Sequence, residues 1–298
     1  MTPLEYILQQ LINAVSIGSL YALMAIGLAM VFGILRLINF AHGDLIMVGS
    51  YTACLLIGIG IPFWWAAAGG ILMSTIAGLL MERLAYRPIR GAPDVAMLLT
   101  SFAVTIFLEN LAIIIFHATS RPFPSPAIFN SIIEIGNIQI SSLNIISIGI
   151  TVILMIFLTL FVTRTEIGIS MRAAAQDLVA ARLMGINVNA VIATAFAVGS
   201  LLAGVVGIIW SAKVGKIDPL MGFAPVLKAF IASVIGGLGS IPGAILGGYI
   251  LGALEILLQG LLPSTLVPFR DAFVFSILIA LLLFRPNGLL GNSEPEKI

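Results

Sequence analysis

Long apolar runs alternate with short polar segments along the whole chain. The runs are about 20 residues long, which is the length of α-helix that crosses ~30 Å of hydrocarbon. One of these runs, around residues 234–252, is expected to be a broken segment followed by a span. The fold class is therefore all-α: a polytopic helical integral membrane protein with about eight or nine spans, some short or broken. The other predicted spans cover residues 7–32, 44–60, 62–81, 95–116, 143–163, 190–210 and 271–284.

The composition agrees with this pattern and narrows the class of protein. Hydrophobic residues make up 60% of the chain and charged residues 9%, and the mean hydropathy is +1.16. A transmembrane β-barrel would need short alternating segments, which the sequence lacks. The polar gaps reach only about 25 residues, whereas a folded domain rarely has fewer than ~50. We expect one transmembrane domain over 1–298, a cytoplasmic tail at 286–298, and any ATP hydrolysis on another chain.

Arginines assign the polar segments to the two sides of the membrane. Three of them lie in the loop at 82–94, namely Arg83, Arg87 and Arg90, and a second arginine-rich segment follows residue 163. Short loops rich in arginine face the cytoplasm. The Pro- and Ser-rich segment 117–142 lies between these two loops and is therefore expected outside.

Lysines in the second half of the chain contradict the simple rule that every basic loop faces the cytoplasm. The segment after the span at 190–210 contains Lys213, Lys216 and Lys228. We expect it to be a basic external loop, which would attract an acidic docking partner. The net charge of +1 gives no sign of a nucleic-acid partner.

The longest polar interruption, from Arg164 to Asn187, has a helical rhythm. Small and apolar residues recur at i, i+3, i+4 and i+7 between Met171 and Ala181, which predicts one amphipathic helix. Gly185 lies where a left-handed residue would end that helix. Hydrocarbon does not hold three arginines, so we expect a contact surface for a partner. The alternative is a basic loop that lies on anionic headgroups.

Two other stretches predict irregular backbone at membrane depth. The first, residues 35–51, places Asn39, His42, Gly43 and Asp44 between two apolar runs that are too closely spaced for an ordinary loop. Polar side chains and broken helices at this depth line a cavity or are buried in protein. The alternative is a plain cytoplasmic turn.

The second stretch, residues 234–252, has Gly236, Gly237 and Gly239 before Pro242. Gly and Pro interrupt a helix there, and the GxxxG spacings that follow favour close helix packing. Paired breaks in corresponding positions of two halves indicate a translocation site. We therefore predict an internal repeat, with a pathway at the two breaks.

Two carboxylates, Glu109 and Glu255, fall within predicted spans, where an acid is a functional candidate because burying its charge is costly. In an ion-coupled carrier they would bind the coupling ion. The alternative is a structural role, with amides from Asn110 and Gln259 bonding nearby. His42 has no second histidine near it, and the motifs of hydrolases, zinc proteases and P-loops are absent. Neither a catalytic residue nor a metal site is expected.

Four segments resemble the H-type permease subunit of bacterial branched-chain amino acid ABC importers. They are INFAHGDLIMVGSY, ERLAYRPIR, MRAAAQDLVAARLMGIN and KAFIASVIGGLGSIPGAILGGYILG, and the chain then continues into RPNGLLG. These segments occur in the order and spacing of that family, and the resemblance runs nearly end to end. Sugar permeases of the wider superfamily share the Gly-rich pieces.

The resemblance implies a division of labour in the bacterial inner membrane. This chain would pair with a related M-type permease, and two cytosolic ATP-binding subunits would bind ATP and Mg and power the pair. A periplasmic binding protein would deliver leucine, isoleucine or valine. This chain itself would bind no cofactor.

The same resemblance assigns the segment 164–189 as the coupling loop that seats in a groove of the ATPase. Its polar residues and terminal glycine would make the contact: Arg172, Gln176, Asp177, Arg182 and Gly185. No glutamate precedes Ala173, so the chain departs from the EAA-type motif of many importers, which weakens the transfer of residue roles from them.

The cargo stays open at this point, because permeases for urea, short amides or other amino acids share these motifs. An uncharged, Gly-lined path would suit an apolar amino acid that passes without a tight site, with selectivity in the binding protein. The alternative from another class is a stand-alone carrier that uses Glu109 or Glu255 as the coupling group and needs no ATPase.

Overall fold

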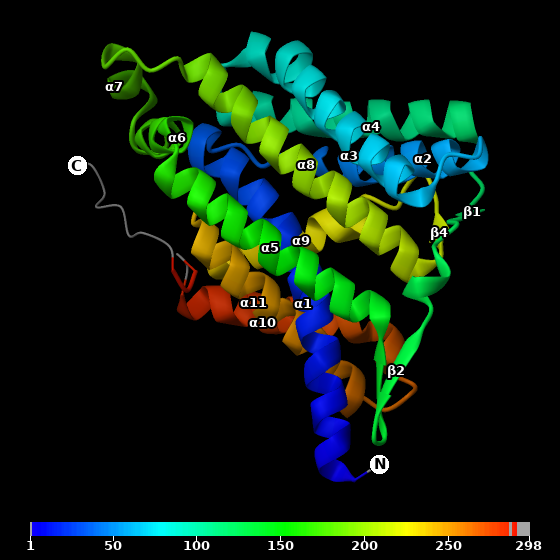
Figure 1. Cartoon of the computed structure of the whole chain (residues 1–298). Coiled ribbons are helices and arrows are strands. Elements are labelled where there is room, and N and C mark those ends of the chain that lie inside the picture. Colours follow the sequence, from blue (N-terminus) through cyan, green and yellow to red (C-terminus); the bar gives the residue numbers. More distant parts are fainter. Residues whose placement is uncertain (1, 286–287, 291–298) are drawn as a thin grey trace.

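The structure of the chain is a computed structural model that describes residues 2–285 and 288–290. Helices dominate the described part, and its strands lie in the connections (Figure 1). The helices are α1 (Pro3–Leu35), α2 (His42–Gly58), α3 (Phe63–Met81), α4 (Asp94–Phe116), α5 (Ser142–Arg164), α6 (Glu166–Gln176), α7 (Leu178–Leu183), α8 (Val188–Val214), α9 (Phe223–Gly236), α10 (Ile241–Leu261) and α11 (Arg270–Phe284). The strands are β1 (Arg121–Pro122), β2 (Ile132–Ile135), β3 (Ile138–Ser141) and β4 (Lys216–Ile217), and η1 (Glu82–Tyr86) is a π-helix. The 3₁₀ helices are η2 (Arg87–Ile89), η3 (Ala127–Phe129) and η4 (Val267–Phe269).

Length and hydropathy show which helices can cross a membrane. Within the described residues, 7 helical segments qualify, and they contain α1, α3, α4, α5, α8, α10 and α11. Helices α2 and α9 are shorter, with 17 and 14 residues, and each adjoins one of the two predicted breaks. The prediction of an all-α polytopic membrane protein is confirmed, and the two short helices account for the higher number of spans expected from the sequence.

Helices α1 and α8 form the centre of the bundle. Most of each spanning window is buried in these two helices, whereas α4 and α11 expose most of their surface. Helix α1 packs against α10, α8, α9 and α5, and α8 also packs against α2 and α3. Lipid tails are as apolar as leucine, so close packing rather than a hydrophobic force selects these neighbours.

Glycines bring α1 and α10 into backbone contact. A methyl group on Gly248 would lie 2.4 Å from the amide nitrogen of Ala22, and one on Gly252 would lie 2.5 Å from the Cα of Gly18. A real side chain does not fit at either distance. The predicted GxxxG spacing from Gly248 to Gly252 is therefore part of the interface that fixes α10 along the central helix.

The two ends of the bundle carry different connections (Figure 1). Helices α6 and α7 lie at one end, where Arg90 donates a hydrogen bond of 2.5 Å to Asn189 Oδ1 and joins the loop after η2 to the start of α8. The strands lie at the other end, where Arg121 of β1 pairs with Ile217 of β4. The two arginine-rich segments thus share one end, and segment 117–142 lies at the other, as the predicted sidedness requires.

The amino terminus lies at the end that carries the strands. Asn137, in the turn between β2 and β3, donates hydrogen bonds of 3.2 Å to both carboxylate oxygens of Glu5. One turn later along α1, Gln9 accepts a hydrogen bond of 3.0 Å from the backbone of Gln139. The hairpin of β2 and β3 therefore anchors the start of α1, a contact that the sequence did not indicate.

We expect Gly248→Val to lower the thermal stability of the purified protein, because its side chain would push α1 and α10 apart. Overpacking of this kind costs about 1–3 kcal/mol. The unfolding midpoint in detergent, followed by size-exclusion chromatography after heating, should fall by several degrees. Gly149→Val on α5 is the matched control, because nothing lies within 4 Å of its added Cβ. Equal midpoints for the two variants would contradict the importance of the α1–α10 contact.

Candidate functional site

The structure contains both predicted helix breaks, and it places them side by side. Helix α1 ends at Leu35 with the left-handed Arg36 (φ 53) as its C-cap, and α2 starts six residues later. Between α9 and α10 the chain turns at Gly237 (φ 107) and Gly239 (φ 81). A methyl group on Gly33 would lie 3.3 Å from the carbonyl oxygen of Gly239. The breaks thus meet towards the end of the bundle that carries α6, while the internal repeat itself stays a prediction.

Buried polar side chains follow the first break. The hydroxyl of Tyr86, in η1, donates a hydrogen bond of 2.7 Å to Asn39 Oδ1. The Nδ2 atom of Asn39, the Nε2 atom of His42 and the Oδ2 atom of Asp44 are buried and have no hydrogen-bond partner in the described part of the chain. Such groups are rare in proteins and call for a water molecule or a ligand.

The imidazole of His42 is enclosed by two helices. A methyl group on Gly27 of α1 would lie 2.7 Å from its Nε2 atom, and Gly199 of α8 faces the same ring. Gly27 is therefore needed to admit the ring between α1 and α8. No group of three or more His, Cys, Asp or Glu side chains that could hold a metal ion occurs within residues 2–285 and 288–290.

The second break is closed by the segment that follows the last span. Gly236 packs against the start of α10, since a methyl group there would meet the carbonyl of Gly243. The amides of Leu289 and Leu290 donate hydrogen bonds of 2.7 and 2.9 Å to the carbonyls of Ile235 and Gly236. Residues 288–290 therefore cover the end of α9, and the rest of the predicted tail, 286–287 and 291–298, lies outside the described residues.

Glu255 is neutralised by a residue that the sequence analysis placed wrongly. Lys228 belongs to α9 rather than to an external loop, and its Nζ lies 2.5 Å from Glu255 Oε1 and 3.2 Å from the Tyr21 hydroxyl. Tyr21 in turn donates a hydrogen bond of 2.8 Å to Glu255 Oε2. Arg270 and Asp271 at the start of α11 complete the network. A buried acid needs a compensating charge, so the sequence signal for this pair is a lysine close to another apolar segment.

The two other lysines of the predicted basic loop lie in different elements. Lys213 lies in the last turn of α8, and its Nζ donates hydrogen bonds of 3.0 and 3.2 Å to Ser16 Oγ and Asn144 Oδ1. Lys216 is exposed in β4. Lys213 and Lys216 are both exposed, so these two lysines remain as the basic groups that the predicted docking of an acidic partner needs.

Glu109 differs from Glu255, because no hydrogen bond or ion pair joins its carboxylate to the described part of the chain. It is half-buried on α4. The amide of Asn110 bonds to the carbonyl of Ile106 in its own helix, and Gln259 accepts a hydrogen bond from Arg270. The side chains of Asn110 and Gln259 therefore form no hydrogen bond with Glu109 or Glu255, contrary to the structural alternative.

The predicted coupling loop forms two short helices instead of one. The chain becomes extended at Asp177 (φ −154, ψ 111), whose carboxylate accepts hydrogen bonds from the amides of Val179 and Ala180. Asp177 thus caps α7, because an aspartate at this position satisfies amides that a continuous helix would have bonded. Met171 and Ala181 are buried, as the predicted face requires.

The outer face of α6 and α7 combines exposed polar and apolar groups. Arg172, Gln176 and Arg182 are exposed. Leu183 and Met184 expose more than 80% of their surface. Gly185 has φ +83, and the Ile186 amide donates to the Ala181 carbonyl over 3.1 Å, so the predicted helix end is confirmed. Large apolar groups on a short helix outside the spans indicate a surface that a partner covers.

An ion pair connects the other arginine-rich loop to this end. The guanidinium of Arg90 bonds to Glu82 of η1 as well as to Asn189. Burial lowers the pKa of Arg90, while the charge of Glu82 opposes that shift. The pair holds the π-helical turn against α8, and the sequence analysis did not identify it.

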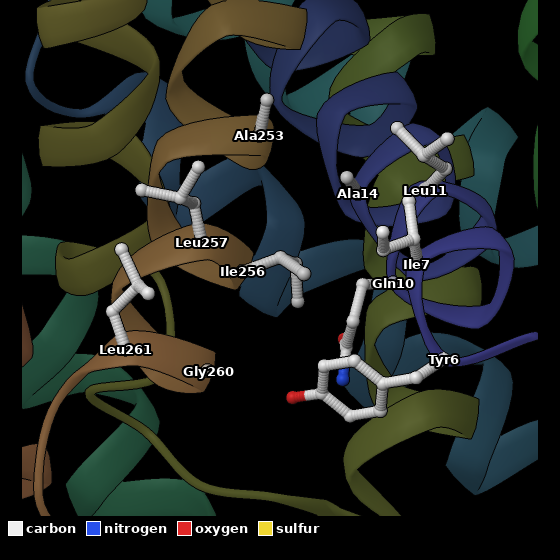
Figure 2. A pocket seen from close by; sticks show the side chains of 10 residues that line it. All are labelled: Tyr6, Ile7, Gln10, Leu11, Ala14, Ala253, Ile256, Leu257, Gly260 and Leu261. Carbon is white, nitrogen blue, oxygen red and sulfur yellow. The ribbon is translucent and has the colours of Figure 1, made fainter. Parts of the chain in front are cut away.

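An apolar pocket with a volume of about 330 Å³ lies between α1 and α10 (Figure 2). Tyr6 and Gln10 supply its polar atoms, and no charged side chain lines it. Its remaining lining residues are Ile7, Leu11, Ala14, Ala253, Ile256, Leu257, Gly260 and Leu261. Such a pocket suits an apolar group and offers nothing to neutralise a charged solute.

Known proteins are similar to this chain in sequence. The family model described as "Branched-chain amino acid transport system / permease component" matches residues 10–283. The Pseudomonas aeruginosa high-affinity branched-chain amino acid transport system permease protein BraD is 38% identical over 100% of both chains. The corresponding permease protein LivH of Escherichia coli K12 is 38% identical over 98% of each chain.

Two more distant proteins extend these comparisons. The permease protein LivM of the same kind of system in Salmonella typhimurium is 24% identical over 96% of this chain and 71% of its own. The solved structure of PsaBC from Streptococcus pneumoniae in complex with Fab has a TM-score of 0.53 and 13% identity, covering 92% of this chain and 91% of that chain. At this identity the structural likeness shows the fold alone.

We expect Lys228→Met to destabilise the protein, because it leaves the Glu255 carboxylate buried without a cation. Breaking a buried pair from one side costs about 3–5 kcal/mol, whereas replacing both partners with apolar residues is often neutral. The double variant Lys228→Met/Glu255→Met should therefore recover most of the lost unfolding midpoint in detergent. Lys216→Met, at an exposed position, is the control and should change little. A double variant that is less stable than Lys228→Met would argue against the pairing.

Proposed function

We propose the function from one premise, that this chain belongs to the family of branched-chain amino acid transport system permease components. The chain is the transmembrane permease subunit of an ATP-driven importer for leucine, isoleucine and valine. The observation that carries this proposal is the 38% identity to the permeases BraD and LivH over essentially the whole of both chains. No bond of the solute is made or broken by this chain.

The proposed partners follow from the same premise. The likeness to LivM over 96% of this chain supports pairing with a second, M-type permease subunit. Two cytosolic ATP-binding subunits would bind ATP and Mg, and a periplasmic binding protein would deliver the amino acid. The assembly would reside in the bacterial inner membrane as a multi-pass complex.

We assign α6 and α7 as the coupling element for the ATP-binding subunits. Their exposed Leu183 and Met184 can enter an apolar groove, and Arg172 and Arg182 can bond to acidic groups at its rim. The buried side of α6 packs on α5, α1 and α8. A displacement of α6 by the ATPases would therefore reach the helices that surround the two breaks.

The broken stretches are the proposed pathway through the membrane. Asn39, His42 and Asp44 contribute polar groups without partners, which water or a passing solute can satisfy. Gly43 packs against the start of α9, since a methyl group there would lie 2.4 Å from the carbonyl oxygen of Gly222. The alternative of an ion-coupled carrier loses one of its two candidate acids, because Lys228 already neutralises Glu255.

We expect Leu183→Asp/Met184→Asp to release the ATP-binding subunits, because charges cannot enter an apolar groove without a cost. The complex should be purified through a tag on this chain from its own membranes, and the co-purifying ATPases quantified. Recovery of the ATPases should fall about tenfold, as for a loss of ~1.4 kcal/mol or more in binding, while the second permease is retained. Arg172→Glu/Arg182→Glu should act in the same direction.

The matched control is Ile132→Asp/Ile133→Asp in β2, which changes two exposed isoleucines at the opposite end of the bundle. This variant should retain the ATPases. If the two aspartate pairs reduced ATPase recovery equally, or if wild type came out alone and still moved solute in liposomes, the coupling assignment would be wrong.

A further inference from the structure

We propose that the groove between α2 and α4 is an intramembrane subsite for the solute, in which a branched aliphatic side chain lies in the groove and its α-ammonium group meets Glu109. This inference rests on the proposed function, since it takes the solute to be an α-amino acid. It replaces the expectation of an uncharged path with a path that carries one carboxyl group, that of Glu109.

Unsatisfied polar atoms are concentrated on the first break, α2 and α4. Within the described residues, eight buried side-chain atoms have no hydrogen-bond partner, and one of them, Glu255 Oε1, is instead ion-paired with Lys228. Five of them belong to this region: Asn39 Nδ2, His42 Nε2, Asp44 Oδ2, Tyr51 Oη and Thr105 Oγ1. Buried polar groups are almost always bonded, so this region is where the structure most needs a ligand or water.

The groove itself has a suitable size and lining. Its volume is about 190 Å³, and for comparison an apolar cavity of about 150 Å³ accommodates benzene. Tyr51 stacks on Phe116 with ring centroids 4.3 Å apart, and its hydroxyl is one of the atoms without a partner. The lining residues are Met47, Val48, Tyr51, Thr52, Leu108, Leu111, Ala112, Ile115 and Phe116.

Glu109 adjoins this groove on the same helix. It follows the lining residue Leu108 and lies one turn from the lining residue Ala112. Thr105, one turn before Glu109 on α4, lies beside the carboxyl group of Asp44 on α2. Glu109 is therefore placed where α4 borders both the groove and α2.

The face of α4 that carries Glu109 is unsuited to lipid. Glu109 lies within the apolar span of α4, and Asn110 beside it is exposed. A carboxylate facing hydrocarbon would be costly, so such a residue faces a water-filled cavity or another protein chain. The sparse packing of α4 in the bundle agrees with a face that borders a pathway.

These features match an α-amino acid with a branched aliphatic side chain. An unpaired carboxylate binds an ammonium group through charge-assisted hydrogen bonds. The apolar lining takes up the aliphatic part, and the Tyr51 hydroxyl is a free donor for the α-carboxylate. The pocket in Figure 2 is larger but has no charged group, so it would leave the ammonium unpaired.

The groove also leads to the first break. Phe102 of α4 stacks on Phe40 of the break with ring centroids 4.8 Å apart. Asp44 lies in the first turn of α2, directly after the break. A solute that leaves Glu109 would therefore next contact Asp44 and then Asn39.

Substituted-cysteine labelling of the whole complex tests whether the groove meets solute. Cys54 is the one cysteine of the chain, so Cys54→Ala gives a clean background. Leu111→Cys places a thiol in the groove, and Ile114→Cys places one on an exposed face of α4 outside it. We expect a small cationic methanethiosulfonate to label Leu111→Cys about tenfold faster, and leucine-loaded binding protein with ATP to slow that labelling severalfold, since a thiol buried in lipid does not ionise.

Labelling of Leu111→Cys at the rate of Ile114→Cys, or labelling that leucine does not change, would overturn the proposal. Cross-linking of Leu111→Cys to the second permease at every stage of transport would overturn it too, because the groove would then be a fixed protein interface. Slower labelling in the presence of leucine, with no such cross-link, supports it.

Uptake into proteoliposomes supplies a second readout with an isosteric variant. Glu109→Gln should lower leucine uptake by the reconstituted complex about tenfold, as expected for losing a hydrogen bond between charged groups, while ATPase recovery on purification stays at the wild-type level. Ile114→Ala is the matched control on α4. Wild-type uptake by Glu109→Gln would contradict the subsite. A wild-type complex that moves no branched-chain amino acid would instead refute the proposed function.

Discussion

Contact between helix backbones, with no side chain between them, is the interaction on which the rest of this structure depends. In lipid no hydrophobic force draws helices together, so close packing of small residues must do so. Gly248 and Gly252 press α10 against α1 in this way, and Gly33 meets Gly239 where the two breaks touch. The breaks are therefore stable features: the packed glycines hold irregular backbone inside protein, where lipid does not reach it.

The acids within the spans differ in how their charge is compensated. Glu255 is bonded to Lys228 and Tyr21 from two other helices, so its charge joins α1, α9 and α10 and is not available to a solute. Asp44, which is buried, and Glu109, which is only half-buried, form no ion pair within the described residues. Unpaired acids within a span are functional candidates, so the difference in pairing supports the proposed subsite on α2 and α4.

Sequence patterns predicted those parts of the structure that follow from local rules. Apolar length placed the spans within a few residues, and Gly185 ended its helix in the left-handed conformation as expected. Pairings across the bundle were not predictable, because they depend on which helices become neighbours. Lys228 was assigned to a loop for this reason, although it lies opposite Glu255. The sequence did not predict the break at Asp177, because the small and apolar residues on both sides of it keep the period of one helix. The Asp177 carboxylate accepts hydrogen bonds from the amides of Val179 and Ala180 and so competes with the backbone carbonyls of a continuous helix.

The break at Asp177 gives the coupling end a property that one continuous helix would lack. Helix α6 is fixed to α5, since a methyl group on Gly168 would lie 2.6 Å from the Cα of Val162. Helix α7 leads directly into α8, whose Gly199 faces the imidazole of His42. A partner that seats on both short helices therefore contacts two separate elements, one attached to the outer helix α5 and one to the central helix α8. A force that changes the angle at Asp177 moves these elements relative to each other, and the first break lies where α8 meets α1 and α2. In the proposed function, a partner on α6 and α7 would therefore be linked through α8 to the polar groups of the first break.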